Sequence, residues 1–109
     1  MEIINNAMLR SMNLKIYGIS QARYCELRNY CRIGKYMPEM RVAALIVEEI
    51  TGIHISEYIL YSVQKNCSFD KLEYHKILGR ITCGRTDFYS YRRLFYHLFD
   101  MMIRAWDEM

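Results

Sequence analysis

The sequence predicts an all-α fold, a compact bundle of about five helices with a long last helix. Residues that favour helices, namely Ala, Leu, Met, Glu, Arg and Lys, recur along the chain, and Pro38 is the single proline. Alternating strand patterns and Asn-Gly hairpin signals do not occur. Because 52% of the 109 residues are hydrophobic and 25% are charged, residues 1–109 are expected to form one helical domain.

The first regular helix is expected after an irregular start. Residues 1–18 hold apolar side chains without a helical phase, which predicts an N-terminal arm or a short helix. A helix is predicted over residues 21–33, because Ser20 offers an N-cap and Gly34 offers a C-cap. Away from its apolar side this helix carries Arg23, Arg28 and Arg32. They form either a solvated basic face or a phosphate-binding one.

The next helix is predicted between Pro38, which suits a first helical turn, and a C-cap at Gly52. Its expected core stripe is mainly apolar and contains Val42, Leu45, Ile46, Glu49 and Ile50, and Ala43 and Val47 widen it. Glu48 and Glu49 point about 100° apart on a helix, and no metal ligand or nucleophile accompanies them. Exposure to solvent is therefore expected for Glu48.

Two short helices are predicted next, over residues 57–66 and 69–78, with N-caps at Ser56 and Ser68 and an end at Gly79. In the second of them the expected core residues are Phe69, Leu72 and Leu78.

The last helix is the longest, with an expected N-cap at Thr86 and an end near Trp106. Its buried stripe is predicted to consist of Phe88, Tyr91, Phe95, Leu98, Met102 and Trp106. The other side carries an aromatic and basic strip made of Arg85, Tyr89, Arg92, Arg93 and Tyr96. This strip is expected to be exposed and to contact a charged partner.

The formal charge of +3 is unevenly distributed. Residues 10–35 hold six basic and one acidic side chain, and residues 71–93 hold six basic and two acidic ones. Between them, residues 36–64 hold four acidic side chains and one basic one. Two basic zones therefore flank an acidic one, and this distribution says more about partners than the net charge does.

Residues 56–106 have the layout of a helix-turn-helix unit, with glycines in the short connection before the last helix. The start of the helix over 87–106 is then the expected recognition helix, since arginine contacts phosphate and guanine edges alike. Phosphate contacts are expected from Lys71, Lys76 and Arg80. The alternatives are a solvated face or docking on an acidic protein, because Arg and Tyr are also enriched in protein interfaces.

Several classes of function are not expected. His54, His75 and His97 have no carboxylate or cysteine at triad or ligand spacing, so the sequence predicts neither an enzyme nor a cofactor. A zinc site formed by Cys83, His75 or His97 matches no finger or ribbon spacing. The four cysteines form no CxxC pair and no signal peptide is present, which predicts a cytoplasmic location. No apolar run reaches the length of a membrane span.

Three segments carry a family resemblance: LKIYGISQARYCELRNYC, ISEYILYSVQKNCSFDKLEYHKI and ITCGRTDFYSYRRLFYHLF. They resemble short regulators encoded by phages and prophages of Firmicutes, a group similar to the RinA/ArpU-type late transcription activators with a sigma-factor-like helix-turn-helix. The resemblance implies a DNA-binding transcriptional regulator. It places Arg85, Tyr89, Arg92 and Arg93 on the recognition helix, with Phe88, Phe95 and Leu98 beneath them.

The chain departs from that group in its compact middle and in its acidic and apolar tail, MMIRAWDEM. The alternative function is therefore a phage anti-defence protein, of the anti-CRISPR type, that binds a host effector protein. It would use the Arg and Tyr strip or an acidic face around Glu48, Glu49 and Glu57. A homodimer through residues 94–106 is a further prediction, because apolar side chains there extend beyond one stripe.

Overall fold

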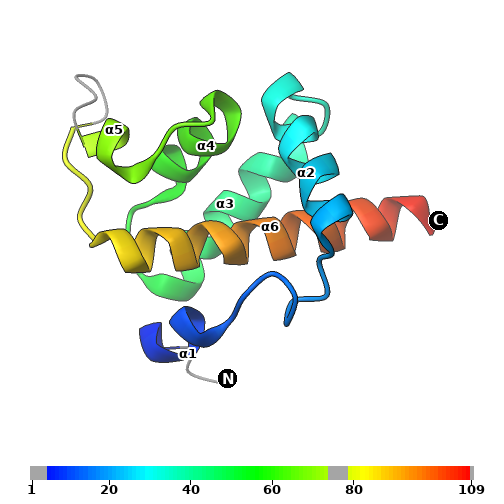
Figure 1. The fold of residues 1–109 in the computed structure, drawn as a ribbon. Helices are drawn as coiled ribbons and strands as arrows, with labels where there is room; N and C mark the ends of the chain where they lie inside the picture. Colours follow the sequence, from blue (N-terminus) through cyan, green and yellow to red (C-terminus); the bar gives the residue numbers. More distant parts are fainter. Residues whose placement is uncertain (1–4, 74–78, 109) are drawn as a thin grey trace.

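The computed structural model describes residues 5–73 and 79–108, and this part of the chain is helical, without strands (Figure 1). Its helices are α1 (Asn6–Ser11), α2 (Gln21–Ile33), α3 (Met37–Thr51), α4 (Ser56–Lys65), α5 (Phe69–Glu73) and α6 (Arg85–Asp107). The all-α prediction and the long last helix are confirmed. In the region 1–18, the short helix α1 forms behind an Asn5 N-cap.

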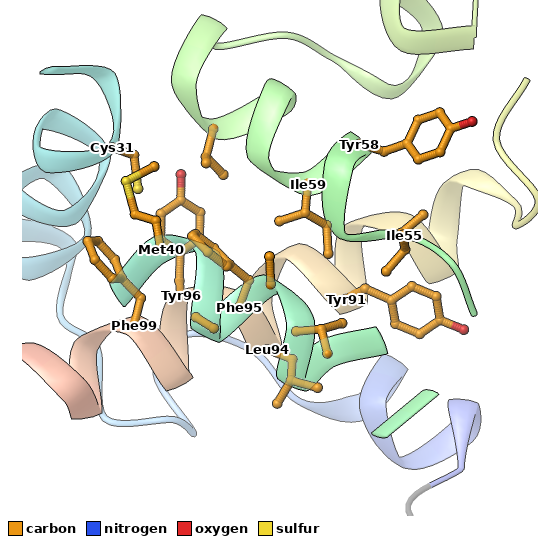
Figure 2. Close-up of a cluster of buried hydrophobic side chains, with 14 of the residues drawn as sticks. Cys31, Met40, Ile55, Tyr58, Ile59, Tyr91, Leu94, Phe95, Tyr96 and Phe99 are labelled. Atoms are coloured by element: carbon orange, nitrogen blue, oxygen red, sulfur yellow. The ribbon is translucent and has the colours of Figure 1, made fainter. Parts of the chain in front are cut away.

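The long helix α6 crosses the whole bundle and contacts each of the other five described helices (Figure 1). Large side chains recur along it in steps of three or four residues, which buries one broad side. The fully buried ones are Phe88, Tyr91, Phe95, Phe99 and Ile103. Figure 2 shows Phe95 and Phe99 beside Met40 of α3. The core is therefore built around α6.

Local capping signals determine most of the helix ends. The Ser20 hydroxyl accepts a backbone N–H of the first turn of α2 at 3.1 Å. Gly34 and Gly52 end α2 and α3 in the left-handed conformation, with φ of 70° and 71°. These three caps are confirmed. At the start of α6 the N-cap is Gly84, so the prediction of Thr86 is wrong by two residues.

The predicted helix over 69–78 is described only in its first half, as α5. Phe69 and Leu72 are buried there, as expected. Residues 74–78, which include Lys76 and the expected core residue Leu78, lie outside the described residues.

Three apolar residues of the stripes predicted on α3 and α6 are exposed, so their assignment to the core is wrong. On α3, Val42 and Leu45 are 49% and 56% exposed. The buried side of this helix consists of Met40, Ala43, Ala44 and Val47, of which Ala43 and Val47 were expected beside the stripe. Because α3 is apolar on several sides, residue spacing alone does not decide which side faces the core. The side with the small alanines is the buried one, since it leaves room for the large rings of α6. Trp106 is 59% exposed, since the end of α6 extends past the bundle (Figure 1).

Glu48 was expected in solvent, but it caps the next helix. Its side chain is 20% exposed, and its Oε1 accepts the backbone N–H of Ser56 at 2.9 Å. His54 Nδ1 lies 3.1 Å from the same oxygen. Burial raises the pKa of Glu48, but the hydrogen bonds from Ser56, the nearby His54 and the backbone of Ile55 together outweigh this effect and lower the pKa below its ordinary value. Glu48 therefore stabilises the N-terminus of α4. The prediction of Ser56 as the N-cap is wrong by one residue, because α4 begins at Ser56 and its N-cap is Ile55.

Asp100 fastens α2 to α6. Its Oδ1 accepts a hydrogen bond from Arg23 Nε at 2.7 Å, and its Oδ2 accepts one from Arg104 Nε at 2.9 Å. The Asp100 and Arg23 side chains are only 7% and 16% exposed. The prediction that Arg23 belongs to a free basic face is therefore wrong, because this guanidinium is directed to α6 and neutralised there.

Replacing Glu48 with Ala is expected to lower the free energy of unfolding by about 1–2 kcal/mol at neutral pH, because α4 loses its cap. Since folding lowers the Glu48 pKa, its contribution is fully present above the ordinary value of 4.5 and is lost as the pH falls through the folded value. Urea denaturation of the wild type and E48A at neutral pH and near pH 3 measures this difference. The exposed Glu49→Ala is the control, and an equal loss in E48A at both pH values would contradict the assignment.

Replacing Asp100 with Asn is expected to lower the free energy of unfolding by about 3 kcal/mol, because Arg23 keeps a largely buried charge without its partner. The control is Arg104→Ala, which removes the half-exposed partner of the same carboxylate and should cost less than about 1 kcal/mol. Urea denaturation curves give both values. Similar losses of unfolding free energy in D100N and R104A would contradict the prediction, because they would show that the buried Arg23–Asp100 pair contributes no more than the Arg104–Asp100 pair.

Candidate functional site

A groove of about 410 Å³ opens between α2, α4 and α6. Its lining consists of Tyr24, Cys25, Arg28, Asn29, Arg32, Ser62, Val63, Asn66, Arg92 and Tyr96. We name it the arginine groove, because three of these residues are arginines. None of them is Asp or Glu, so the groove is positively charged.

Helix geometry brings the two arginines of α2 to the groove. Residues 25, 28, 29 and 32 are spaced so that they share one face of α2. Leu27 and Cys31 lie on another side of this helix and are buried. Since α2 and α4 both pack on α6, Arg92 of α6 meets this face although it is distant in sequence.

The groove arginines donate hydrogen bonds to neutral acceptors. Arg28 donates to Asn66 Oδ1 at 3.3 Å, and Arg32 donates to Asn29 Oδ1 at 2.8 Å. The third donates from Arg92 Nη1 to Ser62 Oγ at 3.1 Å. Within residues 5–73 and 79–108, no carboxylate forms a salt bridge with any of these three. Their charges are thus free to attract an anion.

Other arginines of the bundle are neutralised. The pairs are Arg10–Asp87, Arg23–Asp100, Arg104–Asp100 and Arg85–Asp70. The first of them joins α1 to α6 with a nitrogen–oxygen distance of 2.6 Å. These carboxylates hold helices together, whereas the arginine groove keeps its positive charge.

A smaller pocket of about 200 Å³ adjoins the arginine groove and extends the basic surface along α6. Its lining consists of Leu14, Tyr24, Tyr89, Arg92, Arg93 and Tyr96. Arg93 Nε donates to the backbone oxygen of Met12 at 2.9 Å, so its acceptor is also neutral. The pocket shares three lining residues, Tyr24, Arg92 and Tyr96, with the arginine groove, so the two lie side by side.

Tyrosine rings hold two of the groove guanidinium groups in place. Arg92 lies 4.7 Å from the ring centroid of Tyr89, and Arg28 lies 5.5 Å from that of Tyr24. Such cation–π contacts restrict the side-chain rotamers. The groove therefore offers its charges in partly fixed positions.

Tyr96 is not part of an exposed strip, so this prediction is wrong. It is 4% exposed and packs edge to face with Tyr24 at a centroid distance of 5.3 Å. Figure 2 shows it within the core near Cys31. Because α2 covers this side of α6, Tyr96 is exposed only where it forms part of the groove wall. Burial raises the pKa of Tyr96.

Two other predicted contacts, Arg85 and Tyr89, are not part of the lining of the arginine groove. The exposed Arg85 pairs with Asp70 of α5, and the hydroxyl of Tyr89 accepts the backbone N–H of Phe69 at 3.1 Å. Both residues thus help to hold α5 on α6. The two further candidates that the structure describes are exposed outside the groove lining: Lys71 and Arg80. The predicted phosphate contact of Lys76 lies outside the described residues.

The four cysteines are free thiols. Burial raises the pKa of Cys31 to about 12 and that of Cys83 to about 11, so both stay protonated at neutral pH. In the part of the chain that the structure describes, no three His, Cys, Asp or Glu side chains are placed to hold a metal ion. His75, considered above as a zinc ligand, lies outside that part. None of the helices described is long and apolar enough to cross a membrane.

Comparison with protein-family models finds no family that matches the chain, and searches of curated proteins and of solved structures find no match either. The resemblance to phage regulators therefore stays a prediction, and the arginine groove itself carries the functional argument.

Proposed function

We propose that the chain is a phage or prophage DNA-binding transcriptional regulator that holds the sugar-phosphate backbone of DNA in the arginine groove. The observation that carries this proposal is the meeting of Arg28, Arg32 and Arg92 in one groove with neutral acceptors only. The regulatory role and the phage origin rest on the sequence resemblance. Such a protein would act in the cytoplasm of the host cell.

The hydrogen bonds of the groove favour a phosphate ligand. When a phosphate enters, each guanidinium exchanges an amide or hydroxyl oxygen for a charged oxygen, and charge-assisted hydrogen bonds are about twice as strong as neutral ones. An arginine that already holds a carboxylate, such as Arg23, gains much less from this exchange. The planar fork of arginine also matches two phosphate oxygens at once.

The size of the groove supports contact with a part of the backbone. A groove of about 410 Å³ has room for one phosphate and its sugar. A whole duplex, whose major groove alone is about 12 Å wide, is too large to enter it and stays outside. The continuation toward Arg93 gives a second phosphate a place along α6.

The second candidate is an anti-defence inhibitor that binds a host effector protein. The same three arginines suit an acidic protein surface, because carboxylates and phosphates share their geometry for arginine. Of the acidic face, Glu49 and Glu57 are exposed, whereas Glu48 is engaged at α4. A homodimer through 94–106 also remains a proposal, supported by the exposed Met101 and Trp106.

The salt dependence of binding tests the proposal. In fluorescence anisotropy with a labelled duplex, three phosphate contacts should give a slope of log K against log salt of about −2.7, and Arg28→Ala with Arg32→Ala should reduce its magnitude by about 1.8. Affinity at low salt should fall at least tenfold. The control is Arg41→Glu on the exposed side of α3, which changes the formal charge by the same two units outside the groove lining and should leave the slope unchanged.

Two results would contradict the proposal. The first is a wild-type protein that binds no duplex at low salt, including DNA that flanks its own gene. The second is an equal loss of affinity in R41E and in R28A/R32A, because it would indicate nonspecific attraction. Capture of one host protein that persists after nuclease treatment would favour the inhibitor instead.

A further inference from the structure

Helix α3 carries apolar side chains on two sides, and larger ones lie outside the core. Its buried side contains Ala43 and Ala44, whereas Val42 and Leu45 are 49% and 56% exposed. A surface helix usually turns its large apolar side chains toward the core. The arrangement of α3 therefore leaves an apolar surface that the described part of the chain does not cover.

The exposed residues of α3 form one continuous face. They are Pro38, Arg41, Val42, Leu45 and Glu49, and they lie within about 100° of the helix circumference. We name this surface the α3 face. Figure 1 shows α3 behind α6, and no residue of α3 lines the arginine groove. The α3 face is therefore separate from the site proposed for DNA.

The charges of the α3 face are placed symmetrically about Leu45. Arg41 precedes Leu45 by one helical turn and Glu49 follows it by one, so each charged residue lies about 6 Å from Leu45 along the helix axis. Neither Arg41 nor Glu49 belongs to a salt bridge in the part of the chain that the structure describes. When two α3 helices cross antiparallel at Leu45, Arg41 of each copy lies opposite Glu49 of the other. A parallel pair would place like charges opposite each other instead.

We infer that the α3 face is an interface between two copies of this chain, which pair antiparallel about a twofold axis at Leu45. Val42 and Leu45 supply the apolar centre of this interface. The two pairs of Arg41 with Glu49 determine the orientation of the copies. The inference does not depend on DNA binding, because it concerns the free protein.

The end of α6 fits a second copy less well. Met101 and Trp106 are exposed there, but they point about 140° apart on the helix, so one partner helix cannot cover both. Pairing through the α3 face also leaves the arginine groove of each copy open, since α3 contributes none of its lining. R41E therefore remains a control for the phosphate contacts of a single groove.

Sedimentation equilibrium of the protein without DNA tests the inference. Because the face is short, a weak dimer with a dissociation constant of about 10–100 μM is expected. R41E makes both charged positions acidic and E49R makes both basic, so each variant alone should weaken dimerisation at least about tenfold. An equimolar mixture of R41E and E49R restores both pairs of opposite charge and should dimerise within about threefold of the wild type. Thermal melting checks that each variant is folded.

A second pair of variants separates the α3 face from the end of α6. Leu45→Glu should abolish the dimer, and Trp106→Ala is the control that should leave it unchanged. A wild type that stays monomeric up to about 1 mM would overturn the inference. So would a mixture of R41E and E49R that dimerises no better than either variant alone. Loss of the dimer in W106A, with L45E unaffected, would assign the interface to residues 94–106.

Discussion

The structure depends on the burial of α6. The four largest fully buried side chains of the described residues, Tyr91, Phe88, Phe95 and Phe99, all belong to this helix. No single neighbour can cover rings on so broad a side, so every other described helix packs on α6. The arginine groove is a consequence of this packing. It lies where α2 and α4 meet α6, and Arg92 projects from α6 between them.

The same packing divides the arginines into two kinds. Carboxylates on α6 bind arginines of other helices, as Asp87 does with Arg10 and Asp100 does with Arg23, and these bonds hold α1 and α2 in place. Along α2, Arg23 and Arg28 point in different directions because they are five residues apart. One side of α2 is thereby fixed to the fold by a buried charge pair, while its other side keeps unneutralised guanidinium groups.

Much of the fold could be predicted from the sequence, because caps at Ser20, Gly34 and Gly52 are local signals. The errors concern what covers a helix. Residue spacing gives the direction in which Tyr96 and Leu45 point from their helices, but not which helix packs on that side. Tyr96 was therefore expected in solvent and Leu45 in the core. Charge pairing is equally nonlocal, since Arg23 and Asp100 are 77 residues apart. The sequence therefore named all the groove arginines without separating them from Arg23 and Arg85, which carboxylates neutralise.

The central position of α6 also affects how the arginines of the groove can bind an anion. Side chains on α6 are restricted, since Arg92 is held by a ring and a hydroxyl and Arg93 by a backbone oxygen. Restricted cations lose little conformational entropy on binding, which suits phosphates that occur at every nucleotide. Arg28 of α2 is restricted in the same way, by the ring of Tyr24 and by the side chain of Asn66. The packing of helices on α6 thus also fixes the positions of guanidinium groups that line the arginine groove.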